Sequence, residues 1–339
     1  DAYRTLPQLI TEAEGGQKAV NVLLSREETY ADISPIRLNS NGVTAFVSIM
    51  RGCNNMCSFC VVPFTRGRER SRDVNSVVKE CEALFNDGYK EVTLLGQNVD
   101  SYHFIDERNN RVINFAKLLE MVAKISPNLR VRFSTSHPKD ITDEVLFTIA
   151  RYENICNYIH LPVQSGSSRV LSLMNRTYSR EWYIARVNRI REILPNCGLS
   201  TDMIVGFCTE TEGDHEQSLE LMEYCQYDLA YMYFYSERPG TLAARRFADD
   251  IPLEVKKKRL QQMVDLHRIH SLKSMQKDVG KAFKVLIEGA SRKNADELFG
   301  RNEQNKVIVF PKENFSKGQY VNVLVETCTA GTLIGKAIH

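Results

Sequence analysis

Short apolar runs alternate with segments of helical period over most of the chain. Residues 45–50 (AFVSIM) predict a strand, and the next segment places Val74, Val77, Cys81 and Leu84 on one helical face. The same patterns predict further strands at residues 91–95, 130–134, 155–161, 199–205 and 229–235, and helices at 115–125, 142–151, 167–174, 180–194, 212–224 and 253–275. Six strand–helix units predict an α/β fold, a parallel sheet rolled into a partial (βα)6 barrel.

The pattern changes near residue 276. Short runs at 283–287, 306–310 and 320–325 are predicted, and no convincing helix lies between them. Five glycines are predicted to break the strands: Gly289, Gly300, Gly318, Gly331 and Gly335. These runs predict a small all-β barrel. The chain then divides into residues 1–40, which are too few for a core of their own, an α/β core at 41–275 and the β barrel at 276–339.

Composition narrows the class of protein. The 339 residues carry a net charge of +2, so a nucleic-acid partner would be bound by local basic patches. No apolar run has the roughly 18 residues of a membrane span, and no signal pattern appears at the amino terminus, which predicts no membrane partner. The nine cysteines are an odd number in a long chain, which predicts free thiols in a reducing cytoplasm.

Three cysteines stand apart from the scattered ones because they fall within eight residues. Cys53, Cys57 and Cys60 follow the first predicted strand with C-x3-C-x2-C spacing. Thiolates are the usual protein ligands of iron–sulfur clusters, and three ligands leave one iron of a [4Fe-4S] cluster open to a cofactor. The alternatives are a zinc site, which would need a fourth Cys or His nearby, and chance spacing.

The cysteine spacing, at the end of the first strand of a six-unit barrel, resembles the radical S-adenosylmethionine (SAM) enzymes. Other segments resemble one branch of them, the methylthiotransferases: VPFTRGRERSR (62–72), LGQNVDSY (95–102), STSHP (134–138), HLPVQSGS (160–167), MNR (174–176), TDMIVGF (201–207) and YSERPGT (235–241). The carboxyl-terminal segments GR (300–301) and NKVIVF (305–310) resemble the TRAM domain, an RNA-binding barrel.

The resemblance implies two sets of contacts. In the first set, polar side chains would bind the charged end of SAM and apolar side chains would lie against its adenine. The residues of this set are Phe59, Gln97, Asn98, Ser134, Ser136, His137, Gln164, Ser165, Arg176, Ile204 and Val205. RNA phosphates would lie against Arg66, Arg68, Arg70, Arg72, Arg301 and Lys306. Two alternatives remain: the arginine run is a solvated charged face, and His137 is a structural histidine.

The resemblance also implies an activity. Segment 62–72 is most similar to the enzymes that methylthiolate N6-isopentenyladenosine beside the tRNA anticodon. Such an enzyme uses a [4Fe-4S] cluster and SAM, binds the tRNA anticodon stem-loop, and needs a reductant protein such as flavodoxin or ferredoxin and a sulfur source. The alternatives are a ribosomal-protein methylthiotransferase and a non-catalytic RNA-binding protein with a structural metal.

Two departures from the family pattern qualify this expectation. Methylthiotransferases carry an amino-terminal domain with three further cysteines and a second [4Fe-4S] cluster, and residues 1–7 resemble only the tail of that domain. Either the chain is a fragment of a longer protein, or it cannot insert sulfur as it stands. In addition, Cys208 follows Phe207 where relatives usually have proline, which is interpreted as a neutral packing change.

Overall fold

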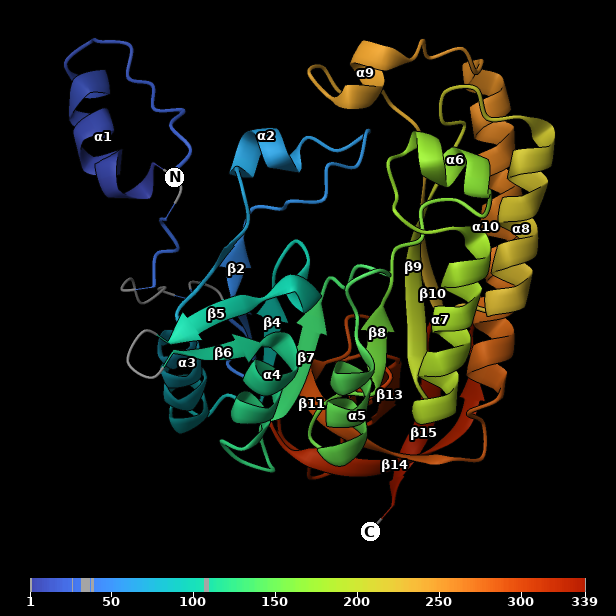
Figure 1. Ribbon diagram of the computed structural model, residues 1–339. Coiled ribbons are helices and arrows are strands. Elements are labelled where there is room, and N and C mark those ends of the chain that lie inside the picture. Colours follow the sequence, from blue (N-terminus) through green and yellow to red (C-terminus); the bar gives the residue numbers. More distant parts are fainter. Residues whose placement is uncertain (1, 26, 32–36, 38–39, 107–109, 339) are drawn as a thin grey trace.

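The computed structural model describes residues 2–25, 27–31, 37, 40–106 and 110–338. Its centre is a curved sheet of parallel strands in the order β1-β4-β7-β8-β9-β10 (Figure 1). A bridge between Val131 and Ile155 joins the two halves of this sheet. The strands are β1 (Thr44–Ser48), β4 (Glu91–Leu95), β7 (Arg130–Ser134), β8 (Tyr158–His160), β9 (Gly198–Val205) and β10 (Leu229–Phe234). This is the predicted partial barrel, with β1 and β10 as its edges.

Amphipathic helices cover the outer face of the sheet (Figure 1). They are α3 (Val74–Asn86), α4 (Phe115–Ala123), α5 (Asp143–Arg151), α7 (Arg180–Ile193), α8 (Glu212–Cys225) and α10 (Leu253–Gln276). Polar side chains at the amino ends accept backbone hydrogen bonds and so fix where five of them begin; these caps are Asp73, Asn114, Thr142, Ser179 and Thr211. The main core lies between these helices and the sheet.

Several local elements differ from the predicted pattern. The first predicted strand is interrupted, so that β2 (Met50–Arg51) leaves the sheet and pairs with β3 (Arg70–Ser71). A hairpin of β5 (His103–Asp106) and β6 (Arg111–Asn114) precedes α4. Short helices are added: η1 (Tyr3–Thr5), α2 (Val62–Arg66), η2 (Val99–Ser101) and α9 (Leu242–Arg246). The helix predicted at 167–174 is present as α6 (Ser168–Leu173), and the amino-terminal segment contains α1 (Leu6–Glu14).

The carboxyl-terminal region is a closed barrel with the order β11-β12-β13-β15-β14. Its strands are β11 (Ala282–Ala290), β12 (Glu297–Arg301), β13 (Val307–Pro311), β14 (Tyr320–Cys328) and β15 (Leu333–Ile338). The prediction that Gly300 and Gly335 break strands is wrong, since they lie inside β12 and β15. A Cβ at either position would meet a backbone oxygen of the neighbouring strand at 2.0 or 2.1 Å, so close strand approach requires glycine there.

Long α10 connects the two barrels, and the β barrel docks at the amino ends of the parallel strands (Figure 1). Two arginines of β7 hold it there. Arg130 donates to the carbonyls of Lys284 and Arg301, and Arg132 donates to those of Asn302 and Glu303. The opposite end of the sheet, where the strands finish, stays free for other elements. Among the described residues, no helix is both long and apolar enough to cross a membrane.

Candidate functional site

The three clustered cysteines lie on a loop that follows β2 and crosses the carboxyl end of the sheet. Gly52 allows the chain to enter this loop, because its φ is +73° and a Cβ there would meet the Arg68 carbonyl oxygen at 2.1 Å. Ser58 fastens the loop to the far half of the sheet, with its N–H donating to Met174 and its hydroxyl to Leu173. Asn175 donates to the Met56 carbonyl at 2.7 Å. The loop therefore bridges the two halves of the barrel mouth.

The chemistry of the thiols fits a cluster better than a single ion. The loop offers three thiols and no fourth Cys or His nearby in the sequence, where a structural zinc site usually has four ligands. A cluster spreads its thiolates around a cube of iron and sulfide instead. Burial raises the pKa of Cys53 to about 11 and also raises that of Cys60. These thiols need a bound cationic group to ionise at neutral pH.

Polar groups without partners gather where the neighbouring strands end. Gln97 and Asn98 follow β4, and His137 follows β7. The Gln97 Oε1, Asn98 Oδ1 and His137 Nδ1 atoms are buried and have no hydrogen-bond partner among the described residues. Burial, with Arg176 and Lys139 nearby, lowers the pKa of His137 to about 2, so its imidazole is neutral. Buried polar atoms are normally hydrogen-bonded, so a polar ligand would supply the partners that these three atoms lack. We call Gln97, Asn98 and His137 the cradle.

Arg176 reaches the cysteine loop directly. Its guanidinium donates to Cys57 Sγ at 3.3 Å, to the Pro162 carbonyl at 2.6 Å and to the Tyr178 hydroxyl at 2.7 Å. Arg176 is itself buried. A guanidinium in this position places fixed positive charge beside the thiols.

The remaining predicted SAM contacts fall into two groups. Phe59 and Ile204 pack against one apolar cluster that includes Val170 and Phe207, and Val205 is buried beside Ile204. Ser134 is the last residue of β7 and lines the lumen cavity described below. Ser136 follows the strand, and its hydroxyl is buried without a hydrogen-bond partner among the described residues. Ser165 is instead fully buried with structural partners, Ser218 and the Ser167 N–H. Gln164 joins β9 through its backbone, bonding Asp202 and Ile204, with a φ of 77°.

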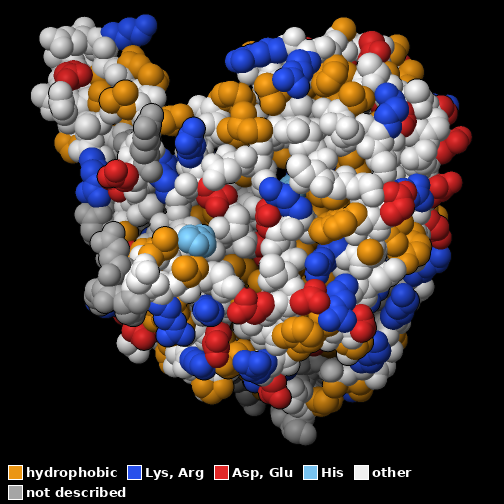
Figure 2. Space-filling view, viewed as in Figure 1, with side chains coloured by type: hydrophobic (Ala, Val, Ile, Leu, Met, Phe, Trp, Pro, Cys, Tyr) orange, Lys and Arg blue, Asp and Glu red, His pale blue; other side chains and the backbone are white. Residues whose placement is uncertain are grey.

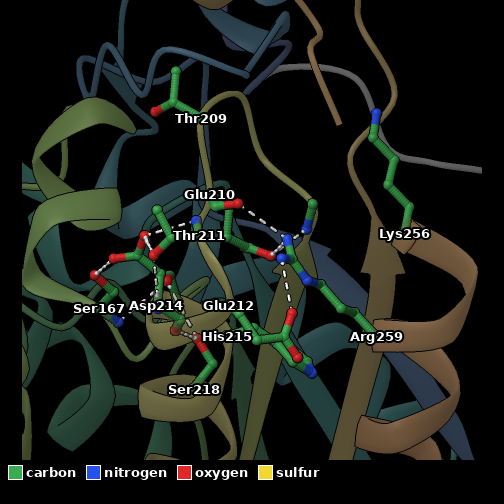
Figure 3. Close-up of polar contacts among 12 residues, drawn as sticks. Ser167, Thr209, Glu210, Thr211, Glu212, Asp214, His215, Ser218, Lys256 and Arg259 are labelled. Atoms are coloured by element: carbon green, nitrogen blue, oxygen red, sulfur yellow. Dashed lines mark hydrogen bonds and ion pairs between the residues drawn. The ribbon is translucent and has the colours of Figure 1, made fainter. Parts of the chain in front are cut away.

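A polar network holds the loop after β9 in place (Figure 3). Glu210 accepts from the Gly206 N–H at 2.8 Å and from Arg259 of α10 at 2.9 Å. Asp214 accepts from the Ser167 hydroxyl at 2.6 Å and closes a capping box with Thr211 at the start of α8. The network ties three separate segments together, so the loop has one defined position.

Replacing Asp214 with asparagine is expected to lower the free energy of unfolding by about 1–2 kcal/mol at neutral pH. Burial opposes ionisation of Asp214, but hydrogen bonds from Arg169, Ser167 and Thr211 outweigh it and hold its pKa well below the usual value. The stabilisation that ionised Asp214 gives the folded state is complete above the usual aspartate pKa of about 4, and it declines as the pH falls below that value. Urea unfolding should show a smaller difference between variant and wild type at pH 3 than at pH 7. An equal difference would contradict this assignment.

A cavity of about 380 Å³ opens between the edge strands, on the inner face of the sheet. We call it the lumen cavity, lined among others by Phe46, His160, Asp202, Tyr231 and Tyr233. Phe46 is 67% exposed and Tyr233 is 55% exposed. His160 Nε2 lies 3.4 Å from Asp202 Oδ1, and the Tyr231 ring meets the imidazole edge-on at 5.7 Å. Aromatic faces beside a polar pair suit a flat, hydrogen-bonding ligand.

Sequence reasoning missed the lumen cavity, although a signal was present. Tyr231 and Tyr233 alternate along β10, and His160 and Asp202 lie on neighbouring strands. Alternation places Tyr231 and Tyr233 on one face of a strand. What the sequence could not show is that the sheet stays open at this edge and leaves Phe46 and Tyr233 exposed.

The structure divides the predicted arginine run. Arg66 and Arg68 are exposed near the cysteine loop. Arg70 and Arg72 are buried, which does not favour their predicted contact with RNA. Arg70 donates to the Ser25 and Arg66 carbonyls, and Arg72 pairs with Glu80. These two guanidiniums are used inside the protein to fix β3 and the amino-terminal segment.

The two predicted RNA contacts in the β barrel lie at the junction of the two barrels. Lys306 is buried and pairs with Asp278 at 2.6 Å and with Asp228 at 3.3 Å, which does not favour its predicted contact with RNA. Arg301 pairs with Glu91 at 3.0 Å and Glu288 at 2.6 Å, across the junction. Both side chains join the two barrels, and Arg301 also lines the lumen cavity. On the face shown in Figure 2, basic and acidic side chains are interspersed, and no broad basic surface appears.

Comparison with known proteins gives two domain matches. Residues 47–222 match the model of the radical SAM superfamily, and residues 276–338 match that of the TRAM domain. Among curated proteins, the chain is 63% identical to a protein of Amoebophilus asiaticus over 99% of this chain and 71% of that protein. It is 56% identical to a protein of Christiangramia forsetii, over 100% of this chain and 73% of that protein. Both are named tRNA-2-methylthio-N(6)-dimethylallyladenosine synthase.

Two solved structures share the fold at low sequence identity. One is a radical S-adenosylmethionine methyltransferase from Kitasatospora setae with tryptophan and a SAM analogue bound, with a TM-score of 0.53 and 15% identity over 72% of this chain and 52% of that one. The other is coproporphyrinogen III oxidase from Escherichia coli, with a TM-score of 0.50 and 15% identity over 77% of this chain and 67% of that one.

Proposed function

The chain belongs to the tRNA-2-methylthio-N(6)-dimethylallyladenosine synthase family of radical SAM enzymes, and from this premise we propose that it modifies tRNA. The reaction would add a methylthio group to C2 of N6-dimethylallyladenosine, also called N6-isopentenyladenosine, beside the anticodon. The observation that supports the proposal is that one sheet carries both features: the loop of Cys53, Cys57 and Cys60 crosses its carboxyl end, and the lumen cavity with its exposed aromatic rings lies on its inner face.

Members of the family use a [4Fe-4S] cluster and SAM, and we propose that the three cysteines of the loop ligate this cluster. When bound, cluster and SAM supply the radical that removes the hydrogen from C2. Arg176 would place its charge beside the cluster at Cys57. Gln97, Asn98 and His137 would satisfy their unpaired atoms with the charged end of SAM. Phe59 and Ile204 would cover its adenine.

The target base would enter the lumen cavity. A base must leave its stack before a radical can reach C2, and an unstacked base is held by aromatic faces and by hydrogen bonds to its edge. Tyr231, Tyr233 and Phe46 provide the faces, while His160 and Asp202 provide the polar groups. Arg66 and Arg68 are exposed near the mouth and would contact phosphates.

The reaction also needs components outside the chain. We propose that a low-potential reductant protein, such as flavodoxin or ferredoxin, supplies electrons and that a separate sulfur source supplies the inserted atom. The place of action would be the cytoplasm, where tRNA is found and thiols such as these stay reduced.

A labelled RNA hairpin tests the proposal without requiring sulfur insertion. The RNA carries N6-dimethylallyladenosine with deuterium at C2 and is incubated with cluster-loaded protein, SAM and a strong reductant. We expect deuterium in the 5′-deoxyadenosine, as measured by mass spectrometry. The matched RNA with unmodified adenosine should give little transfer. SAM cleavage without deuterium transfer from the prenylated RNA would contradict the tRNA assignment, and a ribosomal-protein loop would then be the next substrate to test.

A further inference from the structure

One end of the lumen cavity is built by the β barrel. The turn between β12 and β13 reaches the amino ends of the parallel strands, and its residue Asn305 lines the cavity together with Arg301 of β12. Close packing holds the turn there. Gln304 donates to the Asn196 carbonyl at 2.7 Å, and a Cβ at Gly198 would meet the Gln304 carbonyl oxygen at 2.9 Å. The carboxyl-terminal domain therefore contributes side chains to a cavity of the α/β core.

Strand register places a row of polar side chains beside this turn. His160 of β8 pairs with Ser200 of β9. Tyr158 precedes His160 by two positions, and Asp202 follows Ser200 by two, so alternation directs these side chains to the same face of the sheet. The cavity is lined by Tyr158, His160 and Asp202, whereas Ser200 is fully buried.

The row and the turn form a continuous chain of hydrogen bonds. Ser200 Oγ lies 2.6 Å from the Tyr158 hydroxyl and 2.8 Å from His160 Nδ1. Burial raises the pKa of Tyr158, and hydrogen bonds from Ser200 and Asn305 oppose this rise. At the other end of the chain, Arg301 donates to Asn305 Oδ1 at 2.9 Å. The chain therefore runs from the β barrel to the imidazole in the cavity.

A guanidinium has only donors, so the direction of every bond in this chain is fixed from one end. Asn305 accepts from Arg301 through Oδ1, which leaves its amide N–H as the donor to Tyr158. The Tyr158 proton then goes to Ser200, and the single hydroxyl proton of Ser200 goes to His160 Nδ1. Because Nδ1 accepts, the neutral imidazole carries its proton on Nε2.

The chain leaves a donor and an acceptor side by side in the cavity. His160 Nε2 lies 3.4 Å from Asp202 Oδ1, which is longer than an ordinary N–H···O hydrogen bond, so both atoms can still bind a ligand. A donor beside an acceptor matches the edge of adenine that presents N7 as acceptor and N6–H as donor. One alkyl group on N6 leaves one N–H for this contact. C2 lies on the opposite side of the ring, so this edge can be held without covering the reacting atom.

We propose that Asn305 and Tyr158 are positioning residues that fix the proton of His160 on Nε2. In this state Nε2–H binds N7 of the target adenine, and Asp202 accepts from N6–H. Asn305 does not touch the base and acts through Tyr158 and Ser200. The β barrel thereby sets the hydrogen-bonding pattern of a cavity in the other domain. The contact with the base rests on the proposed function, whereas the position of the proton does not.

Ring-nitrogen NMR of the full chain, labelled with 15N-histidine, tests the position of the proton. At about pH 8, above the usual histidine pKa of about 6.5, Nδ1 of His160 should have the chemical shift of an unprotonated nitrogen and Nε2 that of a protonated one. His160→Gln identifies these signals. Asn305→Asp replaces the amide donor with a carboxylate acceptor, which reverses the chain and should move the proton to Nδ1.

Asn294→Asp is the matched control, because it makes the same charge change in an exposed loop of the same barrel. It should leave both chemical shifts of His160 as in wild type. An Asn305→Asp protein that keeps the proton on Nε2 would overturn the proposal.

An RNA hairpin that carries 7-deaza-N6-dimethylallyladenosine, with carbon in place of N7, tests the contact with the base. Under the conditions of the deuterium experiment, wild type should lose about 10-fold in kcat/KM for transfer from C2, the effect of one lost hydrogen bond. Asn305→Asp should use both RNAs equally poorly, because its Nε2 no longer donates. Equal transfer from both RNAs by wild type would overturn the contact with N7. Absence of transfer from the RNA that contains N7 would overturn the proposed function and leave the NMR result standing.

Discussion

Replacing Cys57 with alanine is expected to remove the visible absorbance of the iron–sulfur cluster and to lower SAM cleavage by more than about 1,000-fold, or about 4 kcal/mol of barrier. In the proposed site three thiolates of one loop hold the cluster, and alanine leaves two. The change also removes the hydrogen-bond acceptor of Arg176, which would remain buried beside the gap. Iron and sulfide content per chain after anaerobic reconstitution, with 5′-deoxyadenosine formation, measures the effect.

The matched control is Cys81→Ala, a fully buried cysteine of α3. It should keep full iron and full SAM cleavage, with a modest loss of stability from the small cavity. If Cys57→Ala retained the iron content of wild type, the assignment of this loop as the cluster site would be wrong. A loss of iron in both variants would show that the effect is one of folding.

The predicted parallel strands were readable because each is a short apolar run ended by polar residues. Residues 91–95 and 130–134 match β4 and β7 to the residue. The order of the strands along the chain follows from these runs. Gln97 and His137 each come just after a strand, so their position at the same end of the parallel sheet follows as well. The candidate site was therefore predictable to the level of which loops compose it.

Burial of charge was not predictable in the same way. Arg66, Arg68, Arg70 and Arg72 look alike in sequence, yet two are exposed and two are buried. The difference lies in partners far along the chain, such as Ser25 for Arg70. Nothing local to an arginine indicates whether a carboxylate or carbonyl from another segment will meet it.

Two strands of the β barrel were missed for a related reason. Phe299 and Ile334 belong to strands that glycine made unrecognisable, since Gly300 and Gly335 are typical turn residues by composition. In the barrel they allow close strand contact instead. Once these strands are placed, alternation alone puts Phe299 outside and Leu298 inside.

The junction between the barrels contains a buried acid surrounded by arginines. Glu91 has a side chain that is 1% exposed and pairs with Arg132 at 2.9 Å and Arg301 at 3.0 Å. Burial opposes its ionisation, but Arg132, Arg301 and Arg130 outweigh it and hold the pKa of Glu91 below its usual value. A single carboxylate therefore neutralises charge from both domains.

Replacing Glu91 with glutamine is expected to lower the free energy of unfolding by about 3–5 kcal/mol, because buried guanidiniums lose their counter-charge. The melting temperature should fall by about 5–10 °C. Calorimetry measures this, with Glu326→Gln as control, since that acid pairs with Lys336 at the surface and should change stability by less than about 1 kcal/mol. The lowered pKa means that wild type keeps this stabilisation above about pH 4 and loses it in acid, so the two proteins should converge there. A Glu91→Gln protein as stable as the control at pH 7 would show that backbone contacts alone hold the β barrel in place.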